Sequence, residues 1–72
     1  MTEPVVVKLS TRRDAKKYRV TYTDAGPRMV EVWEPTRSYN SHYVWKAIWN
    51  SDYPLEGKAL DAVRVASRMR GL

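Results

Sequence analysis

Two alternating runs of residues meet at a short turn in the first half of this chain. In the first run, KKYRVTYTD, the alternate positions Tyr18, Val20 and Tyr22 are apolar or aromatic. A two-residue period puts side chains on opposite faces of a strand, so this run is expected to bury one face. The second run, RMVEVWE, also alternates, and the stretch Asp24–Pro27 between them holds a Gly and a Pro, which favour a turn. The pattern predicts an antiparallel hairpin over residues 17–34.

The second run also indicates which of its side chains face inward. Val30 and Val32 share one face of the predicted strand, and Glu31 and Trp33 share the other. The valines are the better core residues, so Trp33 is expected on the outer side. A small core has room for about two of the three indoles. We therefore expect Trp33 to be substantially exposed until a partner covers it.

Another strand is predicted before the hairpin. A β-branched run begins at Val5 and continues through Leu9, after an end at residues 1–4 that we expect to be frayed. The stretch LSTRRDAKK that follows is polar and basic, and it is expected to form a loop or a single helical turn.

A fourth strand is predicted after the hairpin. Pro35 ends the second run, and the polar stretch 36–41 is expected to be a linker. Residues 42–49 are rich in Tyr, Val, Trp and Ile, which favours a strand, although a short helix capped by Ser41 stays open. As a strand, this segment places four alternate side chains on one face: Tyr43, Trp45, Ala47 and Trp49.

Residues 55–70 show the pattern of an amphipathic helix. Apolar residues recur at helical spacing on one face: Leu55, Ala59, Ala62, Val63, Ala66 and Met69. Pro54 suits the start of a helix, and Gly71 stands where a left-handed residue would end it. Gly57 costs about 1 kcal/mol inside a helix, so Lys58 is an alternative first residue.

These elements together predict an α+β fold, an antiparallel three- to four-stranded sheet with one C-terminal α-helix packed across a face. A chain of 72 residues is expected to be a single domain, 1–72. It has no Cys, so neither a disulfide nor a thiolate zinc site can stabilise it. We expect no metal and no cofactor. The chain shows no signal-peptide pattern and no long apolar run, so a cytoplasmic location without membrane contact is expected.

The formal net charge is +5, which favours polyanionic partners such as nucleic acid or an acidic protein surface. Six cations lie within residues 8–19 against one acid, Asp14: Lys8, Arg12, Arg13, Lys16, Lys17 and Arg19. Charge-assisted bonds from such a basic ridge would suit phosphates or carboxylates. The alternative is an ordinary solvated loop.

Aromatic residues offer a second candidate surface. The rings and cations that the hairpin brings near one another are Tyr18, Tyr22, Trp33, Arg19 and Arg28. Exposed rings interleaved with cations would let nucleobases stack. The competing expectation, which we favour for most of the rings, is that Tyr18, Trp45 and Trp49 form the core under the alanine-rich helix. Trp33 and Arg28 remain candidate binding residues.

Catalytic patterns are missing from the sequence. His42 has no Cys or paired acid in sequence reach, and Glu31 and Glu34 fall on opposite faces of one strand. No nucleophile elbow, phosphate-binding loop, zinc-protease helix or dinucleotide-binding pattern occurs. We therefore expect neither an enzyme nor a small-molecule substrate.

The segment EGKALDAVRVA resembles the helix of many small sheet-plus-helix domains. In size, basic charge, cysteine-free composition and lack of catalytic motifs, the chain resembles the small regulators that bacteriophages make. That resemblance implies a host partner such as RNA polymerase, a defence nuclease or DNA, met in the host cytoplasm. We expect a non-enzymatic regulator that binds the nucleic-acid or transcription machinery. The alternatives are a protein-binding inhibitor of a nuclease or defence complex, and a structural or assembly component of a larger particle.

Overall fold

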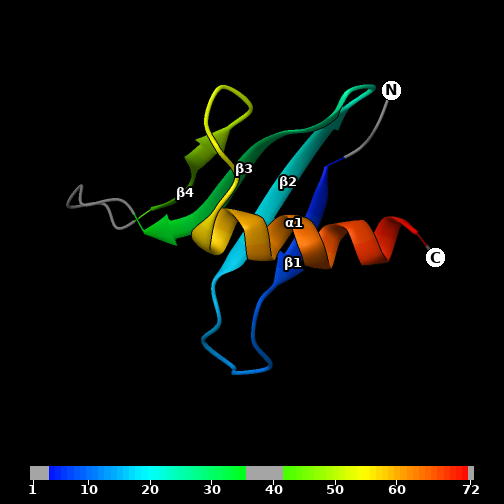
Figure 1. Cartoon of the computed structure of the whole chain (residues 1–72). Helices are drawn as coiled ribbons and strands as arrows, with labels where there is room; N and C mark the ends of the chain where they lie inside the picture. Colours follow the sequence, from blue (N-terminus) through cyan, green and yellow to red (C-terminus); the bar gives the residue numbers. More distant parts are fainter. Residues whose placement is uncertain (1–3, 36–41, 72) are drawn as a thin grey trace.

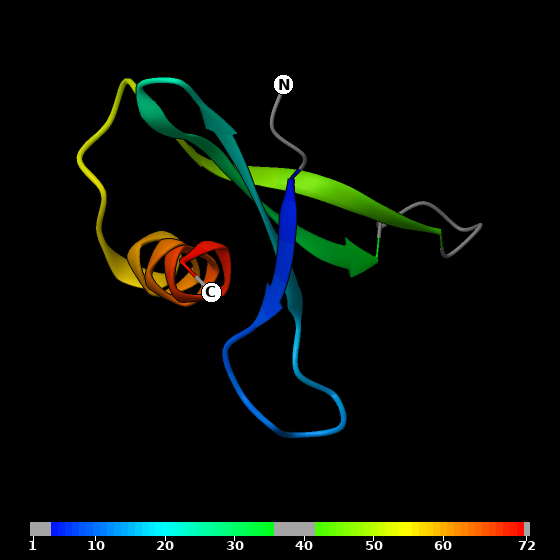
Figure 2. The ribbon, with the colours of Figure 1, turned by 90° about the vertical axis from the view of Figure 1, so that its right-hand side faces the viewer.

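Four strands followed by one helix make up the part of the chain that the structure describes. The computed structural model describes residues 4–35 and 42–71. In chain order its elements are β1 (Val5–Lys8), β2 (Lys17–Thr23), β3 (Gly26–Pro35), β4 (Tyr43–Asn50) and α1 (Gly57–Arg70). The strands form one antiparallel sheet in the order β1-β2-β3-β4, and α1 lies across one face (Figures 1 and 2).

The predicted α+β architecture is confirmed, with four strands in the sheet. Residues 42–49 were open between strand and helix on sequence grounds, and they form the strand β4 apart from His42. Two further expectations lie outside the described residues. These are the frayed end at residues 1–4, of which only Pro4 is described, and the linker at 36–41.

The hairpin predicted over residues 17–34 is present as β2 and β3. Thr23 pairs with Gly26, which leaves Asp24 and Ala25 as a two-residue turn. Gly26 has a φ of 118°, which glycine adopts at little cost because it lacks a Cβ. Thr23 Oγ1 accepts a hydrogen bond from the Ala25 N–H at 3.3 Å and donates one to the Gly26 carbonyl at 3.3 Å.

The core lies between α1 and the sheet. From α1 come Ala59, Ala62, Val63 and Ala66, and from the sheet come Val7, Tyr18, Val20, Tyr22, Val30 and Val32. Val20 and Val30 pair across β2 and β3, and both are fully buried. The alanines allow α1 to lie close to the sheet, where tyrosines fill the space opposite. The inward faces predicted for both runs of the hairpin are therefore confirmed.

The two ends of α1 differ from expectation. α1 begins at Gly57, two residues after the predicted start, and Gly57 has a left-handed φ of 64° that turns the chain into the helix. Gly71 was expected to be left-handed, but its φ of −77° and ψ of −6° are right-handed. The Gly71 N–H bonds to the Ser67 carbonyl at 3.0 Å, so the last turn simply continues the helical conformation.

Met69 was expected on the buried stripe, but it is 51% exposed. Arg70, one position later, continues the inward direction of the stripe. Its guanidinium carbon lies 3.9 Å from the centre of the Tyr22 ring, a cation–π contact that covers the end of the core.

A β-bulge determines which side chains at the end of β4 face the core. Trp49 pairs with the core residue Val30, and Ile48 is the extra residue at this register shift. Trp49 therefore packs against the core and donates its Nε1–H to the Tyr53 carbonyl at 2.9 Å. The prediction that Trp49 shares a face with Trp45 is wrong, because the bulge reverses the alternation between them.

Candidate functional site

The face of the sheet turned away from α1 carries rings and charges together. α1 lies over β1, β2 and β3 on one side only, and no other described helix or strand covers the opposite side (Figure 2). We call this opposite side the open face. Its residues alternate with the core positions and include Val6, Lys8, Lys17, Arg19, Thr21, Met29, Glu31, Trp33, Tyr43, Trp45 and Ala47.

Three rings form an aromatic cluster on the open face. Trp33 and Trp45 pair across β3 and β4, and their ring centroids lie 5.0 Å apart at 53°. Trp33 also stacks on Tyr43, with a centroid separation of 5.7 Å and an interplanar angle of 19°. Such pairs stabilise by about 0.5–1.5 kcal/mol beyond the area they bury. Tyr43 is 55% exposed, so much of its ring still faces solvent.

Trp45 was expected in the core, and this expectation is wrong, since it contacts Trp33 on the open face. Trp33 lies on the outer side as predicted. It is partly buried rather than substantially exposed, because Tyr43 and Trp45 pack against it. The aromatic cluster is therefore assembled in the free protein.

Arg19 links the aromatic cluster to a buried acid. Its Nε donates to Glu31 Oε1 at 2.8 Å and its Nη2 donates to Glu31 Oε2 at 3.0 Å, a two-point pair across β2 and β3. Its guanidinium carbon lies 4.5 Å from the centre of the Trp45 ring. Glu31 is 8% exposed, and a carboxylate buried to this degree needs a partner. Glu31 thus neutralises most of the charge of Arg19. The main effect of the Arg19 side chain is to hold the Trp45 ring in place.

Two lysines bring uncompensated charge to the open face. Lys8 and Lys17 are exposed and pair across β1 and β2, so like charges lie directly opposite. Opposed like charges destabilise a sheet, and a bound anion would relieve that repulsion. Within residues 4–35 and 42–71, neither lysine forms an ion pair.

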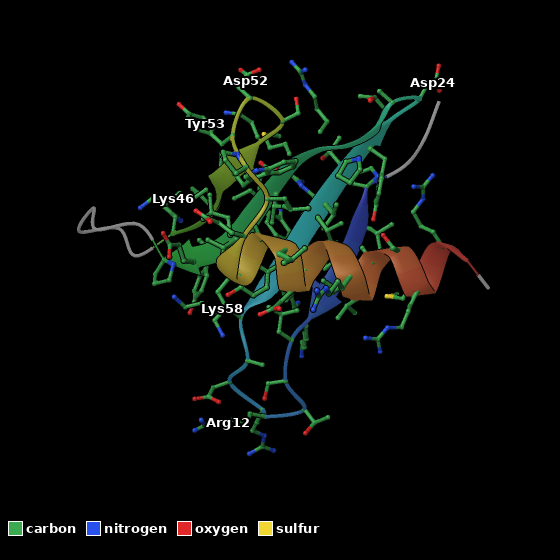
Figure 3. All side chains as sticks on the ribbon, in the orientation of Figure 1. Arg12, Asp24, Lys46, Asp52, Tyr53 and Lys58 are labelled. Carbon is green, nitrogen blue, oxygen red and sulfur yellow. The ribbon has the colours of Figure 1, made fainter. Side chains whose placement is uncertain are left out.

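The loop between β1 and β2 carries the rest of the predicted basic ridge. Arg12 lies at the far end of this loop, pointing away from α1 (Figure 3). It pairs with Asp14 at 3.7 Å, and both side chains are over three-quarters exposed, at 80% and 82%, so the pair contributes little to stability. Arg13 is also exposed. Lys16 at the end of the loop lies 3.8 Å from Glu34.

A hollow lies where this loop meets the aromatic cluster. Its volume is about 310 Å³, and Trp33, Pro35 and Tyr43 supply its flat walls. Lys16, Lys17, Ala15 and Asp14 complete the lining from the loop and the start of β2. We call it the Tyr43 hollow.

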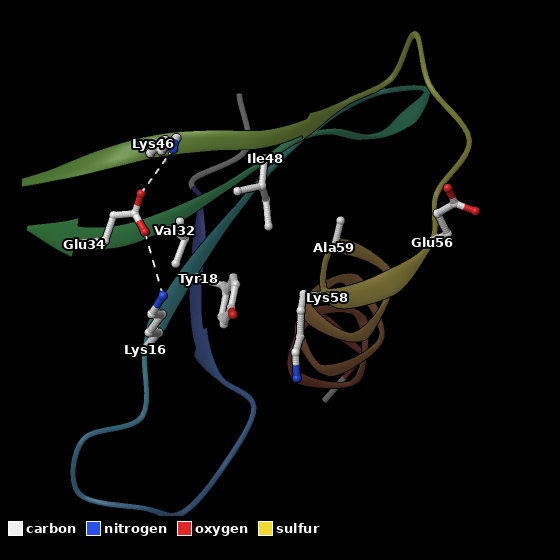
Figure 4. A pocket seen from close by; sticks show the side chains of 9 residues that line it. All are labelled: Lys16, Tyr18, Val32, Glu34, Lys46, Ile48, Glu56, Lys58 and Ala59. Carbon is white, nitrogen blue, oxygen red and sulfur yellow. Dashed lines mark ion pairs between the residues drawn. The ribbon is translucent and has the colours of Figure 1, made fainter.

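Another hollow, of about 390 Å³, lies on the α1 side of the sheet (Figure 4). Glu34 sits between Lys16 and Lys46 there, at 3.8 and 3.6 Å, so one carboxylate serves two lysines. Lys58 and Glu56 add one charge of each sign from α1 and the residue before it. Ion pairing and mixed charge make this hollow a weaker anion site than the open face.

The structure gathers most of the predicted binding residues but not all of them. Lys8, Lys17, Arg19 and Trp33 share the open face. Among the loop cations, Lys16 lines the Tyr43 hollow, and both Arg12 and Lys16 line a hollow with Tyr18 and the α1 residue Lys58. Arg28 lies near the opposite end of the hairpin, where its Nη1 donates to Ser51 Oγ at 3.4 Å.

The predicted stacking platform needs a correction. Tyr18 and Tyr22 belong to the core, so they are not available for stacking. Tyr43 and Trp45 take their place. The alternation of residues 42–49 placed these two rings on one face of their strand. The sequence did not show that Trp33 lies on the same face of the sheet.

Among the described residues there is no group of three or more His, Cys, Asp or Glu side chains that could hold a metal ion. No helix within residues 4–35 and 42–71 is long and apolar enough to cross a membrane. Comparisons with protein-family models, curated proteins and solved structures found no match.

Proposed function

We propose that this protein is a non-enzymatic regulator that acts on the nucleic-acid machinery by binding nucleic acid through its open face. The observation that carries the proposal is the aromatic cluster bordered by Lys8 and Lys17, on a side of the sheet that no described element covers. The net charge of +5 supplies general attraction to a polyanion.

Lysines and aromatic rings contribute differently to the affinity of such an interface. Lysines neutralise phosphates and release their counterions, which makes binding strong at low salt and independent of sequence. Aromatic rings stack on bases and add contacts that salt does not screen. The open face holds both within adjacent strands.

The Arg19–Glu31 pair supports this assignment because it organises the surface in advance. Arg19 is held by two hydrogen bonds and lies against Trp45, so the indole has a fixed position before any partner arrives. A binding surface whose rings are already ordered loses less conformational entropy on association. A surface of single, scattered apolar residues would lack this order.

Fluorescence anisotropy with labelled oligonucleotides tests the proposal. Replacing Lys8 and Lys17 together with Ala should weaken binding at least fivefold and make the salt dependence shallower by roughly one unit per lysine. The matched control replaces Lys58 and Arg64, exposed residues of α1, and should change affinity less than twofold. Equal losses in the two variants would show that net charge, and not the open face, governs binding.

A protein-binding inhibitor is the second candidate, and the edge strand β4 favours it. On the α1 side of the sheet, Val44 and Ile48 are 42% and 41% exposed on either side of Lys46. An edge strand can pair with an extended segment of another protein, which gains main-chain hydrogen bonds. An acidic protein surface, such as one on a host RNA polymerase, would suit the same basic loop. Salt dependence separates the candidates, since a protein interface depends mainly on a few anchor side chains.

A further inference from the structure

We infer that the Tyr43 hollow receives a single unstacked nucleobase, so that the nucleic acid this protein prefers is single-stranded. This inference rests on the proposed function and names its substrate class. The hollow has about 310 Å³, at the lower end of the range of about 300–1,000 Å³ in which small-ligand pockets fall.

The walls of the hollow suit a flat ring. Trp33 and Tyr43 already stack within 19° of parallel at 5.7 Å, which leaves no room for a base between them. The exposed part of Tyr43 is therefore the surface on which a base can continue the stack. Pro35 pairs with Tyr43 across β3 and β4 and supplies a further apolar wall.

The charges around the hollow favour a base inside it and a phosphate at its rim. Lys17 lines it and forms no ion pair within the described part of the chain, so its ammonium group is available to a phosphate oxygen. Lys16 also lines it, although Glu34 shares its charge at 3.8 Å. Asp14 on the same rim repels phosphate but accepts hydrogen bonds from the amino groups of bases. A nucleotide with its base inside the hollow and its phosphate beside Lys17 matches the charges of Lys16, Lys17 and Asp14.

A duplex does not offer the same fit. In a duplex each base face is covered by its neighbours, so a ring can stack only after a base has been unpaired and turned out, which costs free energy. Groove recognition instead needs free polar side chains that reach base edges. The central polar groups of the open face, Arg19 and Glu31, are already bonded to each other. The rings therefore favour a strand whose bases are unpaired.

The test compares full-length protein binding to labelled single strands of DNA and RNA and to a DNA duplex of the same length. The wild-type protein should bind single strands at least tenfold more tightly than duplex, and the DNA and RNA arms show which sugar it prefers. Replacing Tyr43 with Ala should weaken single-strand binding roughly five- to 150-fold, the effect of losing one stacked base, and leave duplex binding unchanged. Replacing Tyr43 with Phe keeps the ring and should restore at least half of the lost affinity in logarithmic terms.

The matched control is Tyr53→Ala, since Tyr53 is 64% exposed but lies beyond the other end of β4. This variant should bind single strands within twofold of wild type. Equal affinity for single strands and duplex, with Tyr43→Ala binding like wild type, would overturn the inference and leave the proposed function standing. Failure of every nucleic acid to bind at low salt would overturn both.

Discussion

Arg19 and Glu31 face each other across β2 and β3 and are joined by two hydrogen bonds of 2.8 and 3.0 Å. The guanidinium carbon of Arg19 also lies 4.5 Å from the centre of the Trp45 ring. Loss of either charge would leave the other partly buried without a partner, which would destabilise the sheet. Loss of Glu31 would also release the Arg19 side chain that contacts Trp45 in the aromatic cluster.

Replacing Glu31 with Ala should therefore lower the free energy of unfolding by roughly 1–3 kcal/mol, a range that allows for the partial exposure of Arg19. Glu34→Ala is the matched control. Its contacts with Lys16 and Lys46 are longer and more exposed, so it should cost less than about 1 kcal/mol. Urea denaturation followed by tryptophan fluorescence measures both. A Glu31 variant as stable as the Glu34 variant would show that the two-point pair contributes nothing net.

Gly57, the first residue of α1, and Gly71, which follows its last residue, should respond differently to replacement by Ala. Gly57→Ala forces a side chain into a left-handed conformation and should destabilise the protein by about 1–2 kcal/mol. Gly71→Ala meets an ordinary right-handed conformation, and its Cβ would lie at an acceptable 3.4 Å from the Ser67 carbonyl oxygen. It should be neutral or raise stability by up to about 1 kcal/mol. Thermal unfolding of the two variants checks this difference. A Gly71→Ala variant destabilised as much as Gly57→Ala would indicate a left-handed Gly71 and contradict the prediction.

Val63→Asp should abolish folding. Val63 is 7% exposed in the centre of the buried stripe, and an unpaired carboxylate there costs several kcal/mol, comparable to the stability of a domain this small. Arg64→Asp introduces the same side chain one position later on the exposed side and should fold. Chemical-shift dispersion in a proton–nitrogen NMR spectrum distinguishes the two. A well-dispersed Val63→Asp spectrum would contradict the core described above.

Removing three cations of the loop between β1 and β2 together with Lys17, the first residue of β2, should weaken nucleic-acid binding at least tenfold without unfolding the protein. The quadruple Ala variant changes Arg12, Arg13, Lys16 and Lys17. All four residues are exposed, so their charges contribute little to stability. A triple Ala variant of Lys58, Arg64 and Arg68 removes three exposed charges from α1 and should weaken binding less than threefold. Anisotropy titrations at matched salt compare the two variants. Normal binding by the quadruple variant would show that none of these four cations belongs to the interface.

Much of the fold was predictable because its signals are local. The alternation of β2 and β3 defines their inward faces without any knowledge of partners, and the spacing of Ala59, Ala62, Val63 and Ala66 defines the buried side of α1. The α+β class follows from these elements alone.

The candidate site was only partly predictable because it depends on register. With Thr23 opposite Gly26 and no bulge, the pairing would set Arg19 opposite Val30. The register shift between Thr21 and Tyr22 places Arg19 opposite Glu31 instead. No local sequence pattern predicts that shift.

The bulge between β3 and β4 acts in the same way on the tryptophans. It turns Trp49 to the core while Trp45 stays with Trp33, although strict alternation would keep Trp45 and Trp49 together. Cross-strand geometry therefore decides which rings are structural and which lie on the open face.

The central claim, that nucleic acid binds the open face, is tested most directly by following the three indole N–H signals in an NMR titration with a single-stranded oligonucleotide. The signals of Trp33 and Trp45 should shift or broaden in proportion to occupancy. The Trp49 signal should stay in place, because its N–H is bonded to the Tyr53 carbonyl on the α1 side. A titration that moves Trp49 and the amides of α1 while leaving Trp33 and Trp45 unchanged would contradict the account.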